Sequence, residues 1–67
     1  MDHLIKALDD EIERIKKTVD LLGKEHHFTI ERKEYISGLM GGMFLAQGIS
    51  EKVFNQYGKI LEDIVGQ

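Results

Sequence analysis

The first third of the chain carries an apolar stripe with the spacing of a coiled coil. Its members, which alternate steps of four and three residues, are Met1, Ile5, Leu8, Ile12, Ile15, Val19 and Leu22. A sustained alternation of this kind places side chains along one side of an α-helix. We therefore predict a helix over residues 2–23, with Asp2 as its N-cap. The six residues from Ile5 to Leu22 are called the heptad stripe below.

The heptad stripe can meet another helix in two ways. β-Branched residues at one heptad position, with mainly leucine at the other, favour two parallel strands, so the six residues form our predicted oligomer interface. Alternatively, the stripe packs on other helices of its own chain, because periods of 3.5 and 3.6 residues are hard to separate over about three heptads. Leu4, Ala7 and Leu21 widen the apolar side, which favours a bundle with both kinds of contact.

Two further helices are predicted after a polar connection. The first covers residues 30–47, with Thr29 as its N-cap and Gly48 as its C-terminal stop. The second covers residues 51–65 and begins after Ser50, another good N-cap. Their apolar positions are Ile36, Leu39, Met40, Met43 and Phe44 in the first helix, and Val53, Tyr57, Ile60, Leu61 and Ile64 in the second. The short connection between them predicts an αα-hairpin.

Glycines interrupt the middle predicted helix at three positions, Gly38, Gly41 and Gly42. Each interior glycine costs about 0.5–1 kcal/mol relative to alanine, so a compensating contact is expected. We predict close helix packing at Gly38, Gly42 and Gly58. A break of the helix at Gly41 and Gly42 is the alternative.

Length and composition limit the class of protein. A chain of 67 residues forms one domain at most and buries only about 60% of its unfolded surface, so its stability as a monomer is marginal. The absence of cysteine excludes disulfide bonds, and oligomerisation is the remaining common reinforcement. The uncharged segment at residues 35–50 is too short, and too diluted by glycine, for a membrane span. No signal-peptide pattern opens the chain, which predicts a cytoplasmic protein.

Candidate chemistry is sparse along the chain. His26 and His27 invite a metal hypothesis, but adjacent residues of a helix point in different directions and a zinc site draws three or four ligands. No candidate nucleophile has a candidate base at a spacing typical of a catalytic site. The charged residues of the first predicted helix are expected to form its solvent-exposed side. We therefore expect no enzymatic activity, no catalytic residue, no cofactor and no metal.

A DNA-binding alternative rests on the corner between the second and third predicted helices. Residues 45–50, Leu-Ala-Gln-Gly-Ile-Ser, followed by Val53, resemble the Leu-Ala…Gly-Ile-Ser…Val core of repressor-type helix-turn-helix proteins. Those proteins have two further residues between the alanine and the glycine. The resemblance implies a regulator that contacts DNA through the following helix, at Lys52, Asn55, Gln56 and Lys59. That helix has no arginine, and the net charge of −3 argues against a nucleic-acid partner.

The sequence thus predicts a single all-α domain over residues 1–67. A heptad-patterned N-terminal helix and a C-terminal αα-hairpin are expected to pack as an oligomeric bundle, most simply a dimer. Small size and the lack of catalytic equipment favour a non-enzymatic regulator, inhibitor or adaptor of bacterial or phage type. Such a protein acts by protein–protein contacts through helical surfaces, and the sequence does not identify its partner.

Overall fold

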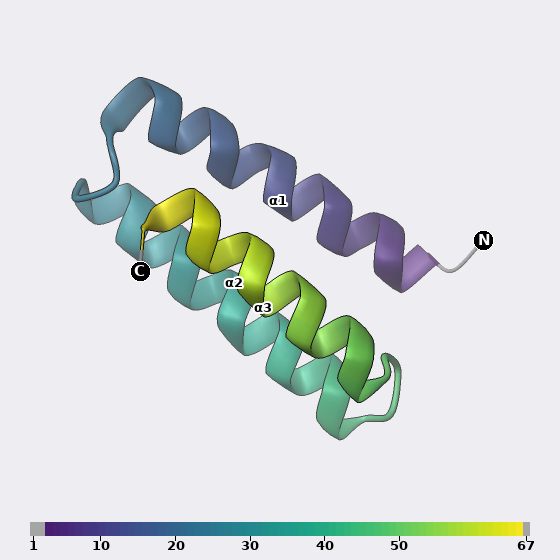
Figure 1. Cartoon of the computed structure of the whole chain (residues 1–67). Coiled ribbons are helices and arrows are strands. Elements are labelled where there is room, and N and C mark those ends of the chain that lie inside the picture. Colours follow the sequence, from purple (N-terminus) through teal and green to yellow (C-terminus); the bar gives the residue numbers. More distant parts are fainter. Residues whose placement is uncertain (1–2, 67) are drawn as a thin grey trace.

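The structure, a computed structural model, describes residues 3–66 and is a bundle of three α-helices. Helix α1 is His3–Leu22, α2 is His27–Leu45 and α3 is Glu51–Val65. The helices lie side by side and alternate in direction, and each contacts the other two (Figure 1). The predicted all-α architecture is confirmed for the described residues, none of which belongs to a strand.

Helix α1 ends at a glycine, for a backbone reason. Gly23 has a φ of 91°, in the left-handed region, and its N–H donates to the carbonyl oxygen of Val19 at 2.9 Å. Glycine adopts this conformation without the steric penalty of a Cβ, so it commonly ends helices. The predicted N-cap at the other end, Asp2, lies outside the described residues.

Helix α2 begins three residues earlier than predicted. His26, rather than Thr29, is the N-cap, and its Nδ1 accepts a hydrogen bond from the N–H of Phe28 at 3.1 Å. Thr29 lies inside the helix and is buried, and its hydroxyl donates to the carbonyl oxygen of Gly23 at 2.7 Å. The threonine therefore ties the start of α2 to the end of α1, a tertiary contact that local sequence does not reveal.

Helix α2 runs through Gly41 and Gly42 without a break and ends at Leu45, two residues before the predicted end. Gln47 takes the left-handed conformation, with a φ of 62°, and its N–H donates to the carbonyl oxygen of Phe44. The N–H of Gly48 donates to the carbonyl oxygen of Met43 at 2.8 Å. These two bonds form a Schellman motif, which satisfies carbonyls that the end of the helix leaves open.

Helix α3 has the predicted bounds and the predicted cap. The Oγ of Ser50 accepts from the N–H of Val53 at 3.2 Å, as an N-cap serine does. The helix ends before Gly66, whose φ of 68° is again left-handed. With α2 it forms the expected αα-hairpin, in which the two helices run alongside each other (Figure 1).

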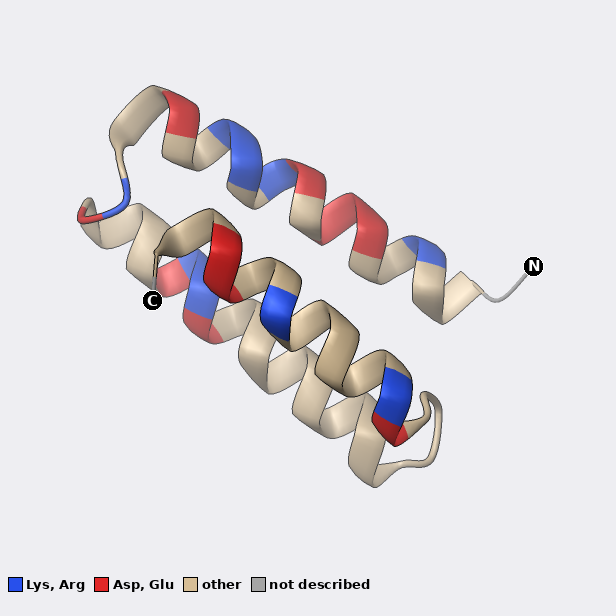
Figure 2. Ribbon diagram, in the orientation of Figure 1, with Lys and Arg blue, Asp and Glu red and all other residues tan. Residues whose placement is uncertain are grey.

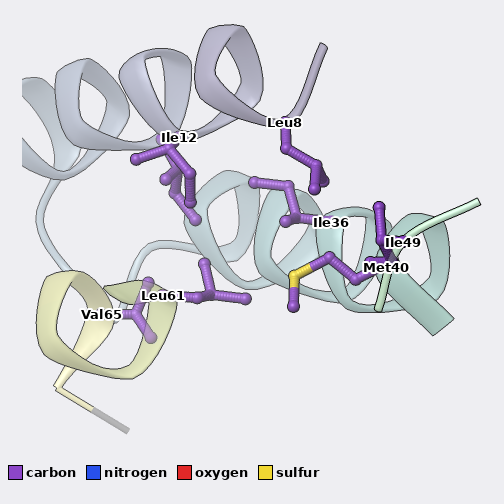
Figure 3. Packing of buried hydrophobic residues seen from close by; sticks show 8 residues of the cluster. Leu8, Ile12, Ile36, Met40, Ile49, Leu61 and Val65 are labelled. Atoms are coloured by element: carbon purple, nitrogen blue, oxygen red, sulfur yellow. The ribbon is translucent and has the colours of Figure 1, made fainter. Parts of the chain in front are cut away.

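The core lies between the three helices and takes residues from each of them (Figure 3). Its buried apolar members are Leu8, Ile12, Ile15, Ile36, Met40, Ile49, Leu61 and Val65. Phe44 and Phe54 stack beside this cluster with their ring centroids 4.9 Å apart, joining α2 to α3. Burial of apolar surface is the main source of stability in such a bundle.

Candidate interaction surface

The centre of the heptad stripe faces the core of its own chain. Leu8 and Ile15 are fully buried and Ile12 is 6% exposed. Ile5 and Val19 are half-buried against the same core, whereas Leu22 is 44% exposed. This arrangement fits the intramolecular alternative for the stripe. In this fold its central side chains are not accessible to a second chain.

The side of α2 that faces away from the core exposes several large apolar side chains. Phe28 is 55% exposed, Tyr35 is 54% exposed and Leu45 is 82% exposed. Residues 35–50 carry no charged side chain, and Figure 2 shows the contrast between this half of α2 and the charged outer side of α1. A helix with apolar residues all around it is normally covered on every side. The exposed side of α2 is therefore a candidate interaction surface.

Two glycines of α2, Gly38 and Gly42, lie on this exposed side and not at a close contact within the chain. A Cβ placed on Gly38 or Gly42 would meet no neighbouring atom within 4 Å. Within the described chain, the predicted close packing at these two glycines is therefore absent, because α1 and α3 lie on other sides of the helix. A Cβ on Gly58 would lie 3.9 Å from the Cε of Met40, an ordinary contact.

A groove between α1 and α2 adjoins the exposed side of α2. It has a volume of about 410 Å³ and is lined by Thr18, Leu22, Phe28, Glu31, Arg32 and Tyr35. We call it the α1–α2 groove. Its lining combines apolar and aromatic surface with one charged residue of each sign, which suits an apolar side chain of another protein better than a small polar ligand.

A charged contact joins the two helices next to this groove. Glu11 accepts from the Nη1 of Arg32 at 3.3 Å and from the Nη1 of Arg14 at 3.3 Å. The guanidinium of Arg32 also lies over the ring of Tyr35, 5.9 Å from its centroid. The glutamate side chain is only 13% exposed, so its charge is shielded from solvent. Sequence reasoning missed this contact because Glu11 and Arg32 are far apart along the chain.

A second polar contact joins α3 to α1. The Oη of Tyr57 donates a hydrogen bond to the Oδ1 of Asp9. This hydrogen bond, burial and the negative charge of Asp9 together raise the pKa of Tyr57 to about 12. Each of these causes favours the neutral phenol over phenolate. The tyrosine was predicted only as an apolar position, and its hydroxyl has a structural role.

The residues considered for DNA contact are all exposed on α3. They are Lys52, Asn55, Gln56 and Lys59, and acidic residues of the same helix precede and follow them (Figure 2). The two helices of a helix-turn-helix motif cross at about 90–120°. Because α2 and α3 instead run alongside each other, the geometry of the corner does not support the DNA-binding alternative (Figure 1).

Residues 3–66 contain neither a cluster of metal ligands nor a membrane-spanning helix. Among these residues, no three His, Cys, Asp or Glu side chains gather in a group that could hold a metal ion. His26 and His27 instead stack on each other, with ring centroids 4.6 Å apart, at the start of α2. Within the same range, no helix combines the length and the apolar character that crossing a membrane requires.

Comparison of the chain with known protein families, with curated proteins and with solved structures finds no match.

Proposed function

We propose that this chain is a small non-enzymatic regulatory or adaptor protein that self-associates and acts by contacts with another protein. The observation that carries the proposal is the exposed side of α2, which presents Phe28, Tyr35 and Leu45 to solvent and carries no charge from Tyr35 onward. Exposed apolar side chains that gather on one element mark interaction surfaces. We propose the cytoplasm as its location. The chain has no cysteine, so its stability does not depend on disulfide bonds or on an oxidising compartment.

The marginal stability of a chain this small supports the self-association. A domain of 67 residues leaves a large share of its apolar surface in water. Covering the exposed side of α2 removes part of that surface from solvent, and the free energy of binding adds to the free energy of folding.

Sedimentation equilibrium over a wide concentration range tests the proposal. We expect the apparent mass to rise from the 7.7 kDa of one chain toward twice that value as concentration increases. Leu45→Lys should weaken this association, because it places a charge on the proposed surface. Leu21→Lys is the matched control, since Leu21 has the same 82% exposure but lies on α1. A chain that stays monomeric at high micromolar concentration would contradict the proposed self-association.

A further inference from the structure

The exposed side of α2 carries a second heptad pattern, distinct from the heptad stripe of α1. Its positions alternate steps of three and four residues, and every one of them is exposed. They are Phe28, Glu31, Tyr35, Gly38, Gly42 and Leu45, called the outer stripe below. Positions spaced in this way form a straight seam along a helix, suited to a second helix laid along it. Neither α1 nor α3 covers this seam, because both lie on the core side of α2.

We infer that the outer stripe binds the outer stripe of a second copy of this chain, with the two α2 helices antiparallel. This inference rests on the proposed self-association and specifies its geometry. The register that pairs Tyr35 with Gly38 of the second copy also pairs Glu31 with Gly42 and Phe28 with Leu45. Each pair occurs twice, as in any two-fold symmetric interface.

Side-chain size carries the choice of register. In the antiparallel register, each glycine of the outer stripe lies opposite a large side chain, Tyr35 or Glu31. The space beside Gly38 and Gly42 is empty in the single chain, so it can receive these side chains. Close fitting of a large residue into the space beside a small one is how packed helices reach the density of a protein interior. The glycines thus acquire the close contact that the single chain does not give them.

At each end of the proposed interface, the α1–α2 groove of one copy receives Leu45 of the other. Leu45 is 82% exposed at the C-terminal end of α2, and the groove lies at the N-terminal end, around Phe28 and Tyr35. An antiparallel pair brings Leu45 of each copy to the groove of the other. The groove volume of about 410 Å³ is ample for one leucine side chain. An exposed knob and an open groove at opposite ends of one helix are self-complementary only in the antiparallel orientation.

Charge also separates the two orientations. A parallel pair in register would place Glu31 against Glu31 and Tyr35 against Tyr35, with the glycines facing one another across unfilled space. Like charges directly opposite each other are destabilising. The antiparallel pair instead places the charged first turns of α2 against the uncharged half of the second copy, residues 35–50.

The surface area of the single chain is consistent with a covered face. The accessible surface is 4745 Å², whereas a compact monomer of 7.7 kDa is expected to expose about 4300 Å². The excess of roughly 400 Å² is about half of the roughly 800 Å² that each partner contributes to a standard interface. A second copy laid along α2 with an interface of standard size would cover this excess and about as much area again.

Gly38→Leu tests the fit of the outer stripe. A Cβ at this position meets no neighbouring atom within 4 Å, and leucine replaces a poor helix former, so circular dichroism should show undiminished helix. It fills the space that Tyr35 of the second copy would occupy, and we expect the dimer dissociation constant to rise at least tenfold. Ser37→Leu is the matched control, since it adds the same side chain one residue away and off the stripe. Equal dissociation constants for the two variants would overturn the inference.

Disulfide trapping tests whether the two α2 helices are antiparallel. Because the chain has no cysteine of its own, only the introduced cysteines can react. Glu31→Cys chains mixed with Gly42→Cys chains should form a mixed disulfide in a glutathione redox buffer. Residues 31 of the two copies are about 16 Å apart in the proposed register, beyond the roughly 7 Å between Cα atoms that a disulfide spans. Preferential homodimers of Glu31→Cys would therefore indicate a parallel pair and overturn the inference.

The outcomes separate this inference from the function on which it rests. The wild-type chain could form a dimer that is unaffected by Gly38→Leu and gives no mixed disulfide. Self-association would then be supported, but the outer stripe would not be its interface. A wild-type chain that stays monomeric at high micromolar concentration removes both. An outer stripe that binds only a helix of a different protein would give this second result.

Discussion

At the scale of single residues, polar side-chain contacts join each helix to another helix or to the turn before it. Thr29 donates to the carbonyl oxygen of Gly23, Arg32 pairs with Glu11, and Tyr57 donates to Asp9. Each of these contacts gives a group at the edge of the core a defined partner. Buried polar groups without partners destabilise a fold, so such contacts determine which packing of the helices is tolerated.

The contact between Tyr57 and Asp9 predicts a pH effect. The pKa of Tyr57 is raised from 10.0 to about 12 in the folded chain, so the neutral phenol is favoured by folding. The resulting stabilisation is fully present below about pH 10 and is lost as the pH rises toward 12, because the unfolded chain releases the proton first. Absorbance titration near 295 nm should show one phenol ionising late.

Substitutions at Tyr57, Asp9 and Tyr35 test whether the late-ionising phenol is that of Tyr57. Tyr57→Phe should remove the late step, and Asp9→Asn should shift it to lower pH, because the carboxylate no longer accepts the hydrogen bond or repels the phenolate. Tyr35→Phe should leave the late step in place. A late step that persists in Tyr57→Phe would show that the contact with Asp9 does not control this ionisation.

At the scale of the elements, local signals predicted well where the chain itself supplies the chemistry. The bounds of α3 follow from Ser50 as its N-cap and Gly66 at its end, and the bounds and the N-cap are as predicted. The start of α2 was predicted wrongly, because the hydroxyl of Thr29 bonds to Gly23 in the preceding turn and leaves the cap to His26. A helix end that depends on a tertiary contact is not visible in local sequence.

The C-terminal end of α2 offers a test of helix termination. Gln47 has a φ of 62°, where a side chain is strained and glycine is not. Gln47→Gly should therefore raise the free energy of unfolding by about 1 kcal/mol, equivalent to about 4–8 °C in the melting temperature. Gly48→Ala should instead lower it slightly, because its Cβ would lie 2.8 Å from a δ-methyl group of Leu4. A loss of stability in Gln47→Gly, measured by urea unfolding, would contradict this account of the turn.

At the scale of the whole molecule, the sequence predicts which residues are apolar but not which helix covers them. Leu8, Ile12 and Ile15 have the spacing of a dimer seam, and in the fold they meet α2 and α3 of the same chain. The reason is physical: three heptads are too few to distinguish a supercoil from an ordinary bundle helix. The groove beside Tyr35 was also missed, since it exists only once α1 and α2 are packed together.

The two stripes therefore predict two different thermal responses. Ile15 is fully buried, and Ile15→Ala should cost about 2–5 kcal/mol, a large part of the about 3–10 kcal/mol expected for a chain of 67 residues. Because this loss is internal, the melting temperature should fall at every protein concentration. Leu21→Ala, at an 82% exposed position, should change it little. Gly38→Leu should instead reduce the concentration dependence of melting, which reports the dimer. If Ile15→Ala acted only at high concentration, the heptad stripe, not the outer stripe, would form the association.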